Sequence, residues 1–140
     1  MDSKAPLILQ FTEFINPATA LMVDGTLFTC PTGSEYEVVE VIESHTVAGS
    51  DGGAVTADVK KCTSGTAPSA GTSVLSSTFN LKSTANTPVA KNTASGLAAQ
   101  PTRTLKSGER LCLDLTGTLT ALAGFSLTIV LSRKRSATYR

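Results

Sequence analysis

Residues 125–132 read Phe-Ser-Leu-Thr-Ile-Val-Leu-Ser, and this stretch decides the fold class. Its apolar side chains Phe125, Leu127, Ile129 and Leu131 fall on one face, and the hydroxyl side chains Ser126, Thr128 and Ser132 fall on the other. A period of two residues is typical of a β-strand with one buried face. We therefore predict a strand here whose apolar side faces a core.

Three further segments alternate in a similar way. In residues 109–116 the leucines are predicted to face inward and the polar residues outward (Leu111, Leu113 and Leu115 against Arg110, Cys112 and Asp114). Residues 55–60 alternate in the same sense. Residues 36–44 also form a predicted strand, but the alternation breaks at Val38-Val39, which indicates either a bulge or a strand buried on both faces.

Weaker strand candidates complete the pattern, at residues 7–11, 21–23, 26–29, 72–81 and 103–105. Residues 73–78 are also compatible with a single helical turn. Clusters of Gly, Pro, Ser and Asp separate the candidates, as turns do. Short strands with no amphipathic helix predict an all-β, antiparallel β-sandwich. We expect a jelly-roll-like arrangement of about eight strands with an extended N-terminal arm.

The chain divides into three predicted regions. Residues 1–20 form an arm or, equally well, an ordinary first strand. Residues 21–132 form the sandwich, in which residues 84–102 are predicted to be a long polar surface loop. Residues 133–140 form a basic tail that begins Arg133-Lys134-Arg135.

Composition limits the possible functions. The formal net charge is +1, charged residues make up 16% and aromatic residues 5%, with no Trp. Nothing here provides the basic field or the stacking rings of a nucleic-acid-binding protein, and no apolar run is long enough to span a membrane. Low charge favours self-association. The three cysteines suggest no disulfide framework, and the N-terminal apolar run is too short for a signal peptide, so we expect cytoplasmic synthesis.

Candidate chemistry is sparse. His45 is the single histidine, and no serine lies in a nucleophile motif, so we predict a surface histidine at a strand end. Four nearby glutamates are predicted to form a solvated or intersubunit face (Glu35, Glu37, Glu40 and Glu43). Asp51-Gly52-Gly53 with Asp58 does not match a calcium loop. We therefore predict no enzyme activity, no metal and no cofactor.

Roughly the last hundred residues resemble the small virion proteins of tailed bacteriophages. The resemblance rests on a succession of strand and turn signatures: residues 38–46, 53–62 (Gly-Ala-Val-Thr-Ala-Asp-Val-Lys-Lys-Cys), 65–68, 71–75, 79–81, 84–87, 105–111, 114–118 and 122–124, followed by a last strand. It implies a jelly-roll protein on a capsid or tail. The first choice is a decoration (cement) protein that binds the outer capsid lattice and stabilises the head, at the virion surface.

The partners implied are the major capsid protein and further copies of the chain, with a trimer preferred. Two elements are candidates for capsid or intersubunit contact: the apolar residues of the N-terminal segment and the basic residues near the C-terminus (Leu7, Ile8, Leu9, Phe11, Phe14, Ile15, Arg133, Lys134 and Arg135). Apolar residues outside the alternating pattern need a cover. The alternative function is another virion component, such as a receptor- or carbohydrate-binding module of a fibre or spike.

Overall fold

The computed structural model describes residues 6–13 and 24–135. Within them the chain forms ten β-strands and one short 3-10 helix. These are β1 (Leu7–Glu13), β2 (Asp24–Thr29), β3 (Glu35–Ser44), β4 (Thr56–Cys62), η1 (Pro68–Ala70), β5 (Thr72–Ser73), β6 (Phe79–Asn80), β7 (Val89–Asn92), β8 (Thr104–Leu105), β9 (Arg110–Thr116) and β10 (Phe125–Arg135).

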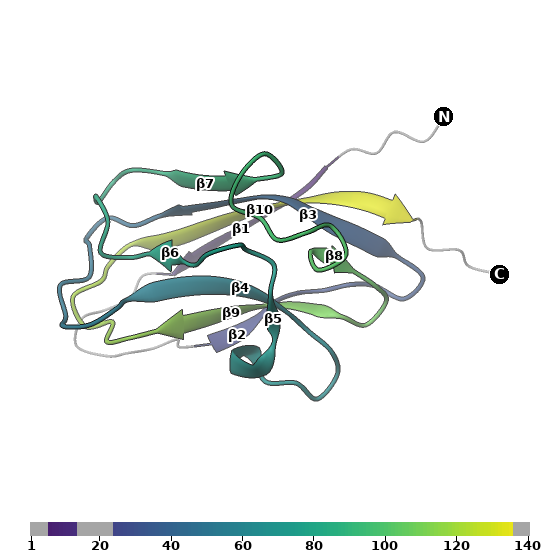
Figure 1. The fold of residues 1–140 in the computed structure, drawn as a ribbon, viewed down its shortest axis with the longest axis horizontal. Helices are drawn as coiled ribbons and strands as arrows, with labels where there is room; N and C mark the ends of the chain where they lie inside the picture. Colours follow the sequence, from purple (N-terminus) through teal and green to yellow (C-terminus); the bar gives the residue numbers. More distant parts are fainter. Residues whose placement is uncertain (1–5, 14–23, 136–140) are drawn as a thin grey trace.

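The strands make two antiparallel sheets that pack face to face (Figure 1). Sheet I has the order β1-β10-β3-β7, with β8 also paired to β3, and sheet II has the order β2-β9-β4-β5, with β6 also paired to β4. Since β5 and β6 share β4, and β7 and β8 share β3, each pair acts as one interrupted strand. Eight strand positions remain, distributed over the two sheets as in a jelly roll. The predicted fold class is confirmed.

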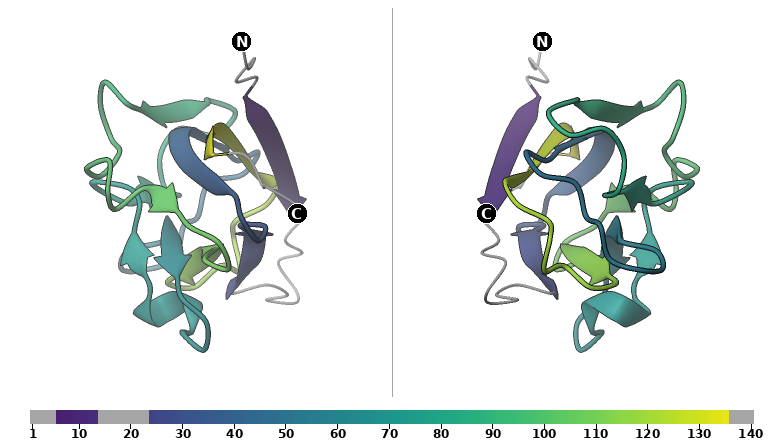
Figure 2. Two further views of the ribbon diagram at one scale, coloured as in Figure 1. Left: turned by 90° about the vertical axis from the view of Figure 1, so that its right-hand side faces the viewer. Right: turned by 90° about the vertical axis from the view of Figure 1, so that its left-hand side faces the viewer.

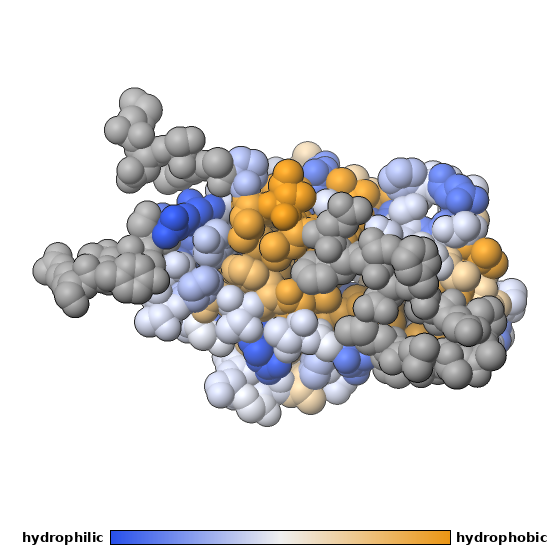
Figure 3. Space-filling model, turned by 180° about the vertical axis from the view of Figure 1, so that it is seen from behind, coloured by the Kyte–Doolittle hydropathy of each residue, from blue (hydrophilic) through white to orange (hydrophobic). Residues whose placement is uncertain are grey.

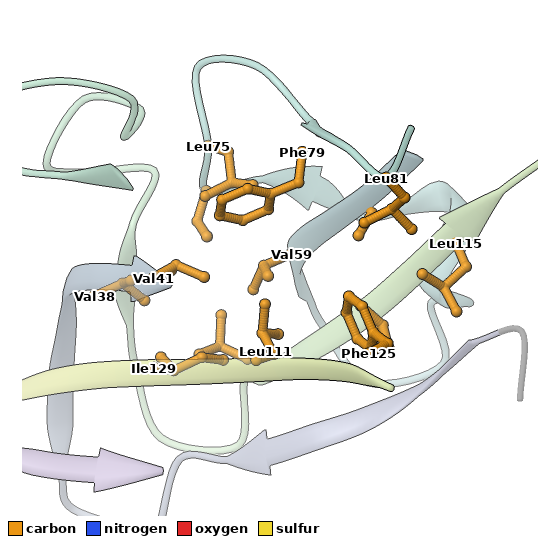
Figure 4. Close-up of a cluster of buried hydrophobic side chains, with 14 of the residues drawn as sticks. Val38, Val41, Val59, Leu75, Phe79, Leu81, Leu111, Leu115, Phe125 and Ile129 are labelled. Carbon is orange, nitrogen blue, oxygen red and sulfur yellow. The ribbon is translucent and has the colours of Figure 1, made fainter. Parts of the chain in front are cut away.

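The alternating segments fill the space between the sheets (Figure 4). All seven residues predicted for the core from residues 109–116 and 125–132 are buried. Val55, Ala57 and Val59, in and just before β4, join them from the inward face of sheet II. Side chains that point to the same side of neighbouring strands exclude water together, and this burial is the main stabilising contribution to such a fold.

The break at Val38-Val39 is a β-bulge. Val130 of β10 pairs with Glu40, and the next residue, Leu131, pairs with Val38, so Val39 is the extra residue of β3. Both Val38 and Val41 remain fully buried on either side of it. The bulge therefore keeps both valines on the core side although they are three positions apart.

Several predicted boundaries are corrected. The predicted loop over residues 84–102 contains β7, which pairs with β3 from Glu40 to Glu43. The predicted basic tail begins too early, because β10 continues to Arg135 and pairs there with β3. The segment 72–81 is interrupted into β5 and β6, with no helical turn between them. The predicted strand at 21–23 lies outside the described residues.

For the N-terminal segment, the structure selects the ordinary strand over the extended arm within Leu7–Glu13. β1 pairs with β10 in register from Leu7↔Leu131 to Glu13↔Phe125. It is the edge strand of sheet I. Phe14 and Ile15, also predicted as contact residues, lie outside the described residues.

Candidate interaction surface

One long side of the sandwich is bounded by two edge strands, β1 in sheet I and β2 in sheet II (Figure 2). Leu7 and Leu9 of β1, with Leu27 and Phe28 of β2, pack against the core but are only partly buried. Seen from this side, hydrophobic residues form a broad exposed area (Figure 3). We call this the open side.

The opposite side is closed by backbone contacts between the two sheets. Leu75, which follows β5, forms an antiparallel bridge with Leu97, which follows β7. Two hydrogen bonds reinforce it: Ser76 N–H donates to Gly96 O and Ala98 N–H donates to Val74 O, each at 2.9 Å. Among the described residues, no comparable backbone hydrogen bond joins β1 to β2. Within the described residues, the two sides of the sandwich therefore differ in how the two sheets are joined.

β1 combines an edge position in sheet I with an exposed apolar side chain. Its inward positions, Leu7 and Leu9, lie opposite buried Leu131 and Ile129, so Ile8 between them points to the outer face, where it is 61% exposed. The strand sequence Leu-Ile-Leu-Gln-Phe-Thr-Glu has no Pro, Lys or Arg. Natural edge strands usually carry such residues to prevent pairing with other chains. β1 thus has the properties of an edge strand that can bind another protein chain.

The two predicted contact elements are brought together. Leu7 pairs with Leu131, two residues before Arg133, so the start of β1 lies beside the basic end of β10. Arg133 and Lys134 are both exposed, and Lys134 lies 3.6 Å from Glu37, which also binds Arg103 at 3.0 Å. An apolar strand with a cation at one end can contact a surface that is apolar with an acidic margin. The predicted contact residues Phe11 and Arg135 also belong to these strands, Phe11 to β1 and Arg135 to β10.

The contribution of β2 to the open side was not predicted. Leu27 lies at a bulge in β2, between the pairs Thr26↔Cys112 and Phe28↔Leu111. Phe28 packs edge-on against Tyr36 of β3, with ring centroids 5.5 Å apart. The short strand candidate at 26–29 was identified, but nothing local in the sequence indicates that it becomes an edge strand on the same side as β1.

The prediction for His45 was wrong. Its side chain is fully buried, with Nδ1 2.8 Å from Glu43 Oε1, and Glu43 is equally buried rather than on a solvated face. The inward position of Glu43 on β3, opposite Leu127, explains its burial. His45 Nε2 lies 3.0 Å from the backbone carbonyl of Ser83, not from a hydroxyl. The arrangement therefore lacks the nucleophile contact of a catalytic triad.

The acidic residues considered for calcium are not brought together. Asp58 accepts a hydrogen bond from Ser73 on the outer face of sheet II. Lys82 Nζ donates to the carbonyls of Asp51 and Gly53, at 2.8 and 3.1 Å, so an ammonium group already occupies that turn. In the described part of the chain, no group of three or more His, Cys, Asp or Glu side chains could hold a metal ion.

The cysteines are free and buried. Cys112 was predicted to face outward; it does lie on the outer face of sheet II, but it is fully buried there, and both β4 and β9 contact η1. The packing is tight, since a Cβ on Gly71 would lie 2.5 Å from Cys62 Sγ. Burial, followed by the Cys112 thiol, raises the pKa of the Cys62 thiol to about 11. A thiol with so high a pKa is a poor nucleophile at neutral pH.

Comparison with known proteins gives a distant likeness only. No family model and no curated protein matches the chain. Among solved structures, a chain of the T13 particle of infectious bursal disease virus matches at 17% identity and a TM-score of 0.39, over 99% of this chain and 37% of that chain. The VP2 protein of the same virus, in derived T=1 particles, matches at 16% identity and 0.30, over 95% and 36%. The chain spans little more than a third of the length of these proteins.

No helix in the described residues has the length and apolar character needed to cross a membrane.

Proposed function

We propose that this protein is a structural, non-enzymatic component of a bacteriophage virion, a decoration protein that binds the outer capsid lattice and stabilises the head. The observation that carries the proposal is the open side, where the edge strands β1 and β2 leave part of a jelly-roll core uncovered. The resemblance of the last hundred residues to phage virion proteins supports the same role. Under this proposal the chain is made in the host cytoplasm and acts at the capsid surface.

The open side provides a physical reason to assemble. Covering about 300 Å² of apolar surface there would contribute roughly 7 kcal/mol before the costs of ordering and association. With a net charge of +1, long-range steering contributes little, so docking depends on shape and apolar contact. The partners we propose are the major capsid protein and further copies of this chain, as a trimer.

A point variant tests the surface better than a deletion. Leu7 and Leu9 pack on the core, so removing β1 would damage the fold itself. Ile8→Glu places a charge on the outer face of β1 and leaves the core positions intact. Val47→Glu is the matched control, because Val47 is also apolar and exposed, at 49%, but lies outside β1 and β2.

The experiment adds each variant to undecorated capsids and measures the bound copies by sedimentation. We expect Ile8→Glu to lower the affinity at least tenfold, which corresponds to about 1.4 kcal/mol, and Val47→Glu to bind like the unchanged chain. Circular dichroism confirms that both variants are folded. Equal binding of the two variants would show that β1 is not the contact.

Light scattering after size-exclusion chromatography tests the oligomer, for which we expect three times the 14.4 kDa chain mass. A monomeric mass together with no binding to capsids would overturn the decoration proposal. That result would favour a receptor- or carbohydrate-binding module of a fibre or spike instead.

A further inference from the structure

A buried acid and a buried base lie together at the end of β3. Glu43 is the second-last residue of the strand, and its neighbours across the sheet are Leu127 on β10 and Val89 on β7. His45 follows immediately after the strand. The side chains of Glu43 and His45 are both completely buried, and their closest atoms, Oε1 and Nδ1, are 2.8 Å apart.

The hydrogen-bond partners fix how many protons the pair holds. The carbonyl oxygen of Ser83 can only accept, so His45 Nε2, at 3.0 Å, must carry a hydrogen. The contact between Nδ1 and Oε1 requires one further proton between them. The pair is therefore either imidazolium with carboxylate or neutral imidazole with carboxylic acid. Both forms are neutral overall and contain the same number of protons.

The same contacts hold a loop in place. Ser83 and Asn86 belong to the connection between β6 and β7, and Ser83 O is the acceptor for His45 Nε2. Asn86 N–H donates to His45 O at 2.7 Å, and Asn86 Nδ2 donates to Thr46 O at 3.4 Å. Asn86 has a φ of 58°, a left-handed conformation that costs energy for a residue with a side chain. The loop conformation thus depends on its contacts with residues 45 and 46.

Among the described residues, no other charged side chain contacts the pair. β10 and β7 present only Leu127 and Val89 to Glu43. In the adjacent turns, Lys82 is bound to the carbonyls of Asp51 and Gly53, and the Asp51 carboxylate accepts from Thr120. Burial raises the pKa of Glu43, and His45 alone opposes that shift. Glu43 Oε2 has no hydrogen-bond partner in the part of the chain that the structure describes, so an unshared negative charge on this carboxylate would be costly.

We propose that Glu43, His45 and the Ser83 carbonyl form a proton-dependent latch, in which one shared proton holds the Ser83–Asn86 loop against the end of β3 and its loss to solvent releases the loop. After the loss, the Nδ1 lone pair faces a carboxylate oxygen at hydrogen-bond distance. That repulsion, within a buried site, favours the open loop. The device is independent of the capsid-binding role proposed above.

The direction of the pH dependence follows from the proton count. Above about pH 6.5 an unfolded histidine is neutral and an unfolded glutamate is ionised, so the closed latch holds one proton more than the open chain. The raised pKa of Glu43 acts in the same direction. A group whose pKa is raised in the folded state contributes stability at low pH and loses it as the pH rises. The latch therefore opens toward alkaline pH.

Hydrogen exchange at the Asn86 amide measures the latch. In the unchanged protein, the protection of this amide relative to intrinsic exchange should fall by up to about tenfold per pH unit above neutrality, as expected when one proton is released. Glu43→Gln should abolish this dependence, because the glutamine amide can donate to Nδ1 of neutral His45 and has no proton to lose. Glu40→Gln, on the same strand but only half-buried, should keep it.

Two results would overturn the proposal. One is an Asn86 protection factor with the same pH profile in the unchanged chain and in Glu43→Gln. The other comes from ¹⁵N NMR of the His45 ring in the unchanged protein, which does not depend on a variant folding. We expect the hydrogen on Nε2 while the latch is closed, because that nitrogen donates to the Ser83 carbonyl. A neutral ring with its proton on Nδ1 would contradict the latch.

Discussion

Asp58 and Asp114 face each other across β4 and β9 on the outer side of sheet II. Like charges in this position repel, and Lys60 relieves only part of the repulsion by binding Asp114 at 2.6 Å. Burial raises the pKa of Asp58, although a hydrogen bond from Ser73 favours its ionised form. At neutral pH this carboxylate therefore costs stability.

Asp58→Asn should stabilise the protein at pH 7, because asparagine still accepts the Ser73 hydroxyl without carrying a charge. A raised folded-state pKa means that the cost grows as the pH rises through that value and vanishes below the unfolded value, near 3.9. Thermal unfolding should show a higher Tm for the variant at pH 7 and no difference at about pH 3. Asp114→Asn is the contrast, since it deprives Lys60 of its partner and should lower the Tm. A lower Tm for Asp58→Asn at pH 7 would contradict this account.

Among the elements, β3 shows most clearly how side-chain direction is set. Its bulge at Val39 separates two stretches that each alternate regularly. The pairs Glu40↔Val130 and Val38↔Leu131 are adjacent on β10, and without Val39 they would be adjacent on β3 as well. Val39 is thus an extra residue in the pairing of β3 with β10. Removing it would leave the residues before and after it opposite the same partners on β10.

Two single-residue deletions test this. Without Val39, the neighbouring pairs keep their partners, and the chain should fold with a modest loss of stability. Without Val41, the bulge is absorbed and Glu40 takes the inward position opposite Ile129. Burying an unpaired carboxylate there should cost on the order of 3–5 kcal/mol. Denaturant unfolding distinguishes the two, and similar losses for both deletions would refute the assignment of Val39.

The sequence predicts elements where the period is unbroken. Residues 109–116 and 125–132 carry their inward apolar side chains at every second position, so both strands and their core faces were predictable, although the burial of Cys112 on the outer face was not. β7, with the sequence Val-Ala-Lys-Asn, has no such period and forms because β3 offers it an edge. Glu43 was misplaced for a related reason, since the bulge changes which residues of β3 face inward. The formation of β7 and the inward position of Glu43 both depend on pairing between strands that are distant in sequence, and a local pattern does not reveal such pairing.

The candidate surface was predictable only in part. The apolar character of Leu7, Ile8 and Leu9 is evident in the sequence, and so is the basic end of β10. The apolar residues and the basic residues lie close together because β1 pairs with β10, and no local sequence pattern indicates that pairing. The participation of Leu27 and Phe28 depends on β1 and β2 lying on the same side of the sandwich.

At the scale of the whole molecule, the closed side and the open side of the sandwich differ in structure. The closed side joins the two sheets through the backbone bridge between Leu75 and Leu97. The open side leaves apolar residues of both edge strands partly uncovered. A chain with one such side has a preferred direction for association, as the proposed binding to a capsid lattice requires.

The position of β10 also determines when the protein can fold. β10 is the last strand of the described chain, yet it lies inside sheet I between the first strand, β1, and β3. Until residues 125–135 have left the ribosome, β1 has no partner and β3 lacks one of its neighbours. A nascent chain ending at residue 124 should therefore remain unfolded by circular dichroism, whereas the full chain should refold in milliseconds to seconds, as expected when distant segments must meet. A cooperatively folded fragment 1–124 would contradict this order. Folding of this sandwich is thus postponed until β10 has been synthesised, and the β1 strand is in that interval a potential site of aggregation between neighbouring nascent chains.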